Sequence, residues 1–321
     1  MSGPLNLGPS PFLLNAPCFY LFSALLRNIY YLNNNQQSFL LHSCGPFAFY
    51  QSTLTNPEIP DWSCVTYQGW QVLTFAGTAN VDQWLLNVLG TAQTHVVPYP
   101  GQVQTYFSQT ANTIWANIQS VLGSAWPLTN CVCVGHSLGG AIADFISWRL
   151  NLLTPGSCPW VYTEGCPRTG NLEWALSPAY PIFSLRNSGD LVPLVPPQRG
   201  SLPVWVSDTL TYGPCQDYYP VGGLWEISPT GRIYPMRLSS IAQPEGALVS
   251  QLYNQGLTIN AISHAAPQYA QRLAYWAARQ MGGQLGVQQG INLDTVNIFQ
   301  QNFGNVDGFN WTVPEGFAGA P

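Results

Sequence analysis

The sequence predicts an α/β fold in which helices flank a mostly parallel central sheet. Short apolar runs typical of buried strands occur at residues 71–76, 131–134, 161–163 and 182–185. Stretches with helical spacing of apolar residues lie at 103–122, 141–150 and 269–280. Because strands and helices alternate along the chain, helical crossovers between parallel strands are expected.

Other parts of the chain carry weaker signals. An apolar stretch at 17–32 favours an amphipathic or buried helix, and the segment from there to about residue 67 is rich in loop-forming residues. Residues 81–89 are compatible with a helix, and residues 224–234 with a hairpin inside a Pro- and Gly-rich excursion. We expect a single domain over residues 1–281 and a Gly/Gln-rich C-terminal extension over 282–321.

Composition limits the classes of partner. The chain has 321 residues, 46% of them hydrophobic and 7% charged, with a net charge of −5. This length and hydrophobic content allow one large α/β domain with a buried sheet. The acidic balance and the absence of a basic cluster argue against nucleic acid and anionic membranes as partners. No obligate protein partner is evident.

The apolar stretch at 17–32 is neither a predicted membrane span nor a secretory signal. It is interrupted by Asn28 and is short for a bilayer, and no basic residue precedes it because the first is Arg27. We therefore expect no transmembrane segment and recognise no signal peptide. The low charge and the cysteines are compatible with an extracellular protein.

Eight cysteines are spread through the chain without a C-x-x-C pair, so zinc-ribbon spacing is absent. Cys131 and Cys133 alternate along a predicted strand and would face the same side of it. Most of the cysteines are interpreted as small buried hydrophobic residues, and one or two disulfides among loop cysteines remain an alternative. The sequence predicts neither a metal site nor a cofactor.

Residues 135–139 read Gly-His-Ser-Leu-Gly, which fits the pattern G-x-S-x-G between a predicted strand and a predicted helix. A serine on so tight a strand-to-helix turn needs neighbours without side chains two positions away, and Gly135 and Gly139 meet this need. Ser137 would then project from the carboxyl edge of the sheet, near the positive end of the following helix. The pattern predicts Ser137 as a nucleophile.

A serine hydroxyl needs a histidine to accept its proton. The chain has four histidines, and His264 is the only one after Ser137. The chain order Ser, Asp, His of hydrolases with such a turn requires a histidine there. His136 would point away from the hydroxyl, and His42 and His95 precede the turn. We therefore predict His264 as the general base.

The acid that orients the histidine should lie between Ser137 and His264. Asp190 follows the predicted strand at 182–185, so its carboxylate should lie at the same edge of the sheet as the serine. Asp208 and Asp217 remain alternatives. Asp190 is the predicted acid.

With these residues the chain resembles the class 3 lipases, the fungal-lipase-like branch of the α/β-hydrolase fold. The resemblance runs from about residue 71 to residue 276, and all four of its blocks occur in the family's order. They are Phe-Ala-Gly-Thr at 75–78 followed by Trp84, the serine turn at 134–141, Gly-Cys-Pro-Arg-Thr-Gly-Asn at 165–171, and Asp-Leu-Val-Pro-Leu-Val-Pro-Pro at 190–197.

The resemblance implies an α/β-hydrolase fold with a helical lid and a triad of Ser137, Asp190 and His264. It also implies an oxyanion hole formed by the backbone N–H groups of Thr78 and Leu138. The lid would follow Thr78 and present an apolar face for substrate. That face consists of Val81, Trp84, Leu85, Val88 and Leu89.

The chain departs from the family near these blocks, and the family's H-x-G-F block is reduced to Tyr-Pro-Gly-Gln-Val at 99–103. Asn87 stands where the family has an aspartate that braces the oxyanion residue, and Glu164 stands where an aromatic residue often precedes the glycine of the third block. The stretch from about 200 to 256, which shapes the substrate pockets, is hard to align. Substrate preference is therefore the least determined property.

The expected function is hydrolysis of carboxylic esters by a serine nucleophile through an acyl-enzyme intermediate. The expected substrates are acylglycerols or other hydrophobic acyl esters, met at a lipid–water interface. A phospholipase A1-like acyl hydrolase and a short-chain carboxylesterase are alternatives. A non-catalytic lipid-binding protein is a further alternative, disfavoured because all three triad residue types are present.

Overall fold

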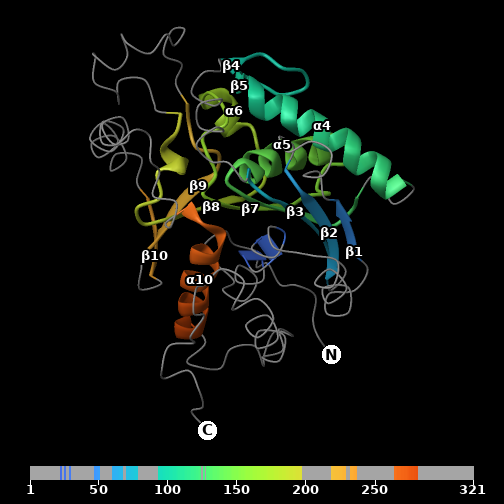
Figure 1. The fold of residues 1–321 in the computed structure, drawn as a ribbon. Helices are drawn as coiled ribbons and strands as arrows, with labels where there is room; N and C mark the ends of the chain where they lie inside the picture. Colours follow the sequence, from blue (N-terminus) through green and yellow to red (C-terminus); the bar gives the residue numbers. More distant parts are fainter. Residues whose placement is uncertain are drawn as a thin grey trace, which may run out of the picture.

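The computed structural model describes residues 22, 23, 25, 26, 29, 47–50, 60–67, 70–78, 93–123, 126, 128–196, 218–228, 232–236 and 264–280. At its centre is an 8-stranded sheet with the strand order β1-β2-β3-β6-β7-β8-β9-β10 (Figure 1). Its strands are β1 (Phe47–Tyr50), β2 (Trp62–Tyr67), β3 (Trp70–Phe75), β6 (Cys131–His136), β7 (Trp160–Glu164), β8 (Ile182–Asn187), β9 (Gly223–Ile227) and β10 (Ile233–Pro235).

The sheet is mostly parallel, because β3, β6, β7, β8 and β9 run in the same direction. The other three strands pair antiparallel with their neighbours at the two edges. Four strands predicted from apolar runs are present with slightly different ends, and the hairpin expected at 224–234 is formed by β9 and β10. The predicted α/β class is therefore confirmed.

One expectation for the N-terminal third is wrong. The segment interpreted as loops up to residue 67 contains β1 and β2. Polar residues such as Ser63 interrupt the apolar pattern of β2, so its sequence does not read as a strand. Antiparallel pairing with β3 along its whole length makes it one, and Trp62 is fully buried there. Tertiary pairing overrides the weak local signal.

Helices cover both faces of the sheet. In the view of Figure 1, α4 (Thr105–Leu122) and α5 (Leu138–Leu153) lie above it, and α10 (Ala266–Gln280) lies below it. The predicted helix at 103–122 begins two residues late because Val103–Gln104 form the short strand β5, which pairs with β4 (Gln93–Thr94). Also present among the described residues are α6 (Leu172–Leu176) and the 3₁₀ turn η2 (Val192–Leu194).

The main hydrophobic core fills the space between the sheet and helices α4 and α5. Leu73 of β3, Phe107 and Ile114 of α4, and Phe145 of α5 are all fully buried in it. Each such side chain stabilises the fold by about 1.5–3 kcal/mol through burial. This packing holds the amino end of α5 against the carboxyl edge of the sheet, where the predicted nucleophile lies.

The opposite face carries residues of the N-terminal segment. Phe22 is buried and its ring lies 5.7 Å from the ring of Tyr162 on β7. The buried residues Phe22, Leu25, Leu26 and Ile29 are helical where described, as expected for a helix packed on the domain.

Several predictions concern residues outside the described part of the chain. These are the lid segment with Val81, Trp84, Leu85, Val88 and Leu89, the alternative acids Asp208 and Asp217, and the extension at 282–321. Among the helices that are described, none combines the length and the apolarity needed to cross a bilayer.

Candidate active site

The predicted strand-to-helix turn is present. β6 ends at His136, Ser137 has φ +56° and ψ −127°, and α5 begins at Leu138. A Cβ at Gly135 would lie 2.1 Å from the carbonyl oxygen of Gly139, and a Cβ at Gly139 would lie 2.2 Å from that of Phe75. The two glycines are therefore required by close packing, as the sequence pattern indicated.

Ser137 is held by the sheet and by its own helix. Its backbone N–H donates to the carbonyl of Glu164 on the neighbouring strand β7 at 2.8 Å. Its side chain is buried, and Oγ has no hydrogen-bond partner among the described residues. The hydroxyl stands at the amino end of α5, where the helix dipole favours a developing negative charge.

His264 lies immediately before α10 and is 3% exposed. Its Nδ1 donates to both carboxylate oxygens of Asp190, at 3.1 and 3.0 Å. Its Nε2 is buried and makes no hydrogen bond within the described part of the chain. The ring therefore has one nitrogen fixed by a carboxylate and the other left for a reacting group.

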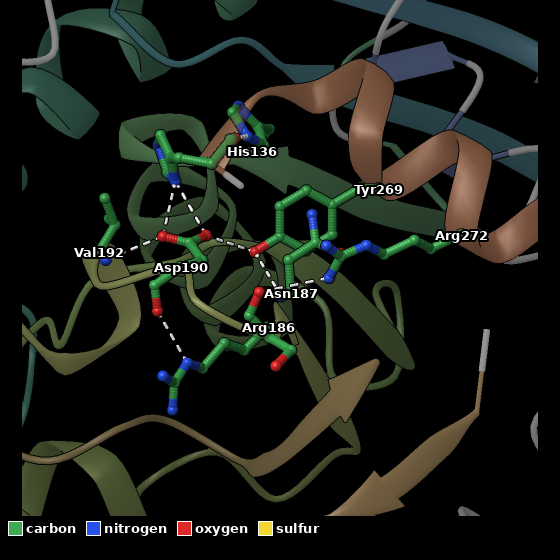
Figure 2. Close-up of polar contacts among 9 residues, drawn as sticks. His136, Arg186, Asn187, Asp190, Val192, Tyr269 and Arg272 are labelled. Atoms are coloured by element: carbon green, nitrogen blue, oxygen red, sulfur yellow. Dashed lines mark hydrogen bonds and ion pairs between the residues drawn. The ribbon is translucent and has the colours of Figure 1, made fainter. Parts of the chain in front are cut away.

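Asp190 follows β8 and is fully buried. Figure 2 shows its carboxylate between Val192, whose N–H donates to Oδ1 at 2.9 Å, and Tyr269, whose hydroxyl donates to Oδ2 at 2.5 Å. Burial alone would raise the pKa of Asp190, but His264 and these hydrogen bonds outweigh it and lower the pKa. Asp190 is therefore an ionised partner for the imidazole.

The Asp190 loop is also fixed through its backbone. The carbonyl of Asp190 accepts from Nε of Arg186 at 2.8 Å, and its N–H donates to the carbonyl of Asn187 at 2.9 Å. Arg186 in turn forms an ion pair of 3.6 Å with Glu226 on β9. These contacts position the carboxylate at the carboxyl edge of the sheet.

Tyr269 is a site residue that the sequence did not indicate. Its hydroxyl donates to Asp190 and accepts the backbone N–H of Asn187 at 3.0 Å. Tyr269 lies on the buried face of α10. In the helical pattern of the sequence it therefore looks like an ordinary core residue. Only the tertiary structure brings it to the carboxylate, 79 residues away in the sequence.

His136 supports the site without titrating. Its Nε2 donates to the carbonyl of His264 at 2.7 Å, and the two rings lie 4.8 Å apart. Burial, followed by the charge of His264, lowers the pKa of His136 to about 3. A ring that stays neutral can donate this hydrogen bond without placing a second positive charge beside the base.

Gly165 allows the acid and the base to meet. It has φ +59°, and a Cβ there would lie 2.9 Å from Asp190 Oδ2 and 2.9 Å from His264 Nδ1. The first glycine of the block at 165–171 is therefore needed for both backbone conformation and space. Sequence reasoning singled out this block only through the family resemblance.

The two predicted oxyanion residues lie on neighbouring elements at this edge. Leu138 is the first residue of α5, and Thr78 lies three residues beyond the end of β3. β3 and β6 are parallel, with Phe75 opposite Gly135. Close packing of Gly139 against the carbonyls of Phe75 and Ala76 brings the start of the Thr78 segment to the start of α5.

Glu164 is a buried acid directly beside the triad residues. It pairs with His136 across the β6–β7 ladder and precedes Gly165. The hydroxyl of Tyr162 donates to Oε1 at 2.7 Å, and the hydroxyls of Ser23 and Tyr162 both favour the ionised carboxylate. Burial raises the pKa of Glu164 to about 8, so this carboxyl is neutral at pH 7.

Other acids and histidines lie away from the site. Asp144 is buried in α5 beside the thiol of Cys166, and burial raises its pKa. His95 is exposed after β4, and His42 lies outside the described residues. Within the described part of the chain, His264 contacts Asp190, and its ring packs against that of His136, the residue next to Ser137; no hydrogen bond joins Ser137 Oγ to His264 Nε2.

Residues 72–200 match the family of class 3 lipases. No curated protein sequence matches the chain. Among solved structures, the chain is similar to the Rhizomucor miehei triacylglyceride lipase, with 18% identity and a TM-score of 0.49 over 65% of this chain and 78% of that chain. It is similar to a lipase from Rhizopus microsporus var. chinensis, with 20% identity and a TM-score of 0.49 over 66% and 74%. A triacylglycerol lipase from Penicillium expansum gives 15% identity and a TM-score of 0.48 over 69% and 83%.

Proposed function

Since residues 72–200 match the family of class 3 lipases and the chain is a serine hydrolase of carboxylic esters, we propose that Ser137, His264 and Asp190 carry the reaction. The observation that carries the assignment is the pairing of His264 with Asp190 beside the strained Ser137 turn. His264 uses Nδ1 for the carboxylate at 3.0 Å, and Nε2 remains buried without a partner among the described residues.

In this proposal Ser137 Oγ attacks the acyl carbonyl while His264 Nε2 accepts its proton. Asp190 holds the proton on Nδ1 and stabilises the imidazolium that forms. The tetrahedral intermediate collapses when His264 returns the proton to the leaving alcohol, which leaves an acyl group on Ser137. Water, deprotonated by the same histidine, then releases the acid.

The negative charge of the tetrahedral intermediate needs donors in place before the reaction. We assign these donors to the backbone N–H groups of Leu138 and Thr78, with the Thr78 hydroxyl as a further donor. Support comes from the position of Leu138 at the amino end of α5, where N–H groups have no partner inside the helix.

The proposed substrates are acylglycerols or other hydrophobic acyl esters. A panel of p-nitrophenyl esters of increasing chain length, with triglyceride and phospholipid emulsions, tests this assignment. We expect preference for long acyl chains and for triglyceride. Preference for phospholipid would indicate a phospholipase A1-like enzyme, and activity limited to short chains would indicate an esterase.

A fluorophosphonate that labels reactive serines tests the nucleophile itself. We expect one label on the wild-type chain and none on Ser137→Ala, with the thermal unfolding of the two proteins alike. Equal labelling of both proteins would contradict the assignment, and absence of label from both would favour a non-catalytic lipid-binding protein.

We further propose that residues 81–89 form a lid that opens at a lipid–water interface. The apolar face with Trp84 at its centre supports the proposal, because a short helix needs a surface that it can cover. Turnover of a short-chain ester should then rise sharply as the substrate passes its solubility limit, and Trp84→Ala should reduce this rise. A smooth rate through the limit would contradict the lid.

We also propose that residues 1–281 form one domain and that residues 282–321 form a C-terminal extension. A single catalytic domain over residues 1–281 would contain all three triad residues, and the extension at 282–321 would not be needed for activity. Truncation after residue 281 should therefore leave kcat for a soluble ester unchanged. Loss of folding would place part of the extension in the domain.

A further inference from the structure

Three cysteine side chains meet in the core on the face of the sheet covered by α5. Cys131 and Cys133 lie on β6, and Cys158 lies just before β7. Their sulfur atoms all lie within 4.8 Å of one another, and all three residues are fully buried. The expectation that Cys131 and Cys133 face the same side of a strand is consistent with this cluster. The ester hydrolysis proposed above uses none of these thiols.

The backbone of Cys158 is held in place by hydrogen bonds with one side chain of α5. Asn151 of α5 donates to the carbonyl of Cys158 at 2.7 Å and accepts its N–H at 3.1 Å. Asn151 also donates to the carbonyl of Ser147 within the helix at 3.1 Å. The helix thus fixes the loop that brings the third sulfur to the two on β6, as supporting residues fix a ligand at a metal site.

The spacing of the sulfur atoms fits a shared ion better than a disulfide. An ion with metal–sulfur bonds of about 2.3 Å separates its ligands by roughly 4 Å in a trigonal arrangement. The Cys158 and Cys133 sulfur atoms are 3.7 Å apart. A disulfide bond is about 2.05 Å long, so these two sulfur atoms are not bonded to each other, and both cysteines are free thiols.

A thiolate is the form of cysteine that binds metals, so each of the three thiols would lose its proton on ligation.

The number of ligands selects the kind of ion. Thiolates prefer soft ions such as Cu(I), Zn(II) and the iron of iron–sulfur clusters. Structural zinc sites and iron–sulfur clusters take four protein ligands, whereas this group of described residues offers three. We propose that Cys131, Cys133 and Cys158 form a buried site for a soft monovalent cation of the Cu(I) type.

Binding exchanges protons for the ion and transfers no electron. Each thiol that becomes a thiolate ligand releases one proton to solvent, and the sulfur lone pair forms the bond to the ion. Because the sulfur atoms are inaccessible in the folded chain, the ion enters as the chain folds or opens locally, and its binding adds to the stability of the folded state.

The test uses the full-length reduced protein, refolded anaerobically with Cu(I) acetonitrile complex and a competing bathocuproine chelator. Wild type should retain one more equivalent of Cu(I) than Cys158→Ala. The melting temperature of wild type should be higher with Cu(I) than without it. Cys64→Ala is the matched control, because Cys64 is another buried core thiol outside the group of three. It should retain as much Cu(I) as wild type.

X-ray absorption at the copper edge of the loaded wild-type protein decides the question even if Cys158→Ala fails to fold. Three sulfur neighbours at about 2.3 Å would support the site. Equal Cu(I) retention by wild type and Cys158→Ala would overturn it. So would oxygen or nitrogen neighbours of the copper, or a disulfide joining two of these cysteines in protein prepared without reductant.

Discussion

The hydroxyl of Tyr269 donates a hydrogen bond of 2.5 Å to Asp190 Oδ2, from a helix that begins just after His264. The same hydroxyl accepts the backbone N–H of Asn187 at 3.0 Å (Figure 2). Asp190 therefore has neutral donors in addition to the imidazole. Such donors keep a fully buried carboxylate ionised, which the proposed role beside His264 requires.

Tyr269→Phe should lower kcat by roughly tenfold, because it removes one charge-stabilising donor while the ring remains packed. The pKa of Asp190 should rise, so the fall of activity at low pH should begin at a higher pH than in wild type. A pH profile of kcat/KM checks this expectation. Tyr234→Phe, at a half-exposed tyrosine of β10, is the control, and identical profiles for all three proteins would rule out the positioning role.

Asp190→Asn should lower kcat by about 10⁴-fold, because an amide in place of the carboxylate favours the wrong tautomer of His264. Asp208→Asn and Asp217→Asn should have small effects. Steady-state kinetics on a soluble ester compare the three variants. A comparable loss in either of the other two would reassign the acid.

Gly165→Ala should reduce activity and stability together. The new methyl group would meet Asp190 Oδ2 and His264 Nδ1 at 2.9 Å, at a backbone position with φ +59°. Gly156→Ala provides the control, because Gly156 also has positive φ, +82°, but open space around its Cβ position. If both variants lose activity equally, backbone strain and not contact with the triad explains the loss.

Thr78→Val keeps the shape of the side chain and removes its hydroxyl. If that hydroxyl donates to the oxyanion, kcat should fall by 10²-fold or more with little change in KM, because the interaction forms only in the transition state. Kinetics on one soluble ester measure both constants. An unchanged kcat would mean that the backbone donors suffice.

Glu164→Gln should stabilise the protein at alkaline pH. The folded chain holds the Glu164 proton up to a pKa of about 8, whereas the ordinary value is 4.5. Between these values the unfolded state has lost a proton that the folded state keeps, so the free energy of unfolding falls as pH rises through this window. The free energy of unfolding lost in this way reaches several kcal/mol at pH 8, and none is lost below pH 4.5.

Denaturant unfolding at a series of pH values checks this prediction. The stability gained by Glu164→Gln should increase from pH 5 to pH 8, whereas Glu173→Gln, at an exposed site, should show no such increase. A gain that does not depend on pH would show that Glu164 is not protonated in the folded chain.

The sequence by itself determined the parts of the site that depend on local geometry. Gly135 and Gly139 flank Ser137 because the turn has no room for a Cβ at either position. Five consecutive residues are therefore enough to predict this turn. The chain order left His264 as the base candidate, and the position of Asp190 after an apolar run placed it at the strand end. The parallel sheet followed from alternating strand and helix patterns.

Tertiary structure alone decided the contacts between residues far apart in sequence. β2 became a strand because it pairs with β3, and Tyr269 became a partner of Asp190 because α10 packs under β8. The neutral state of Glu164 likewise depends on burial by surrounding elements. Residue spacing within one segment predicts which side chains share a face of that segment. It does not state which distant groups will meet that face, because burial and hydrogen bonding arise only when the segments pack.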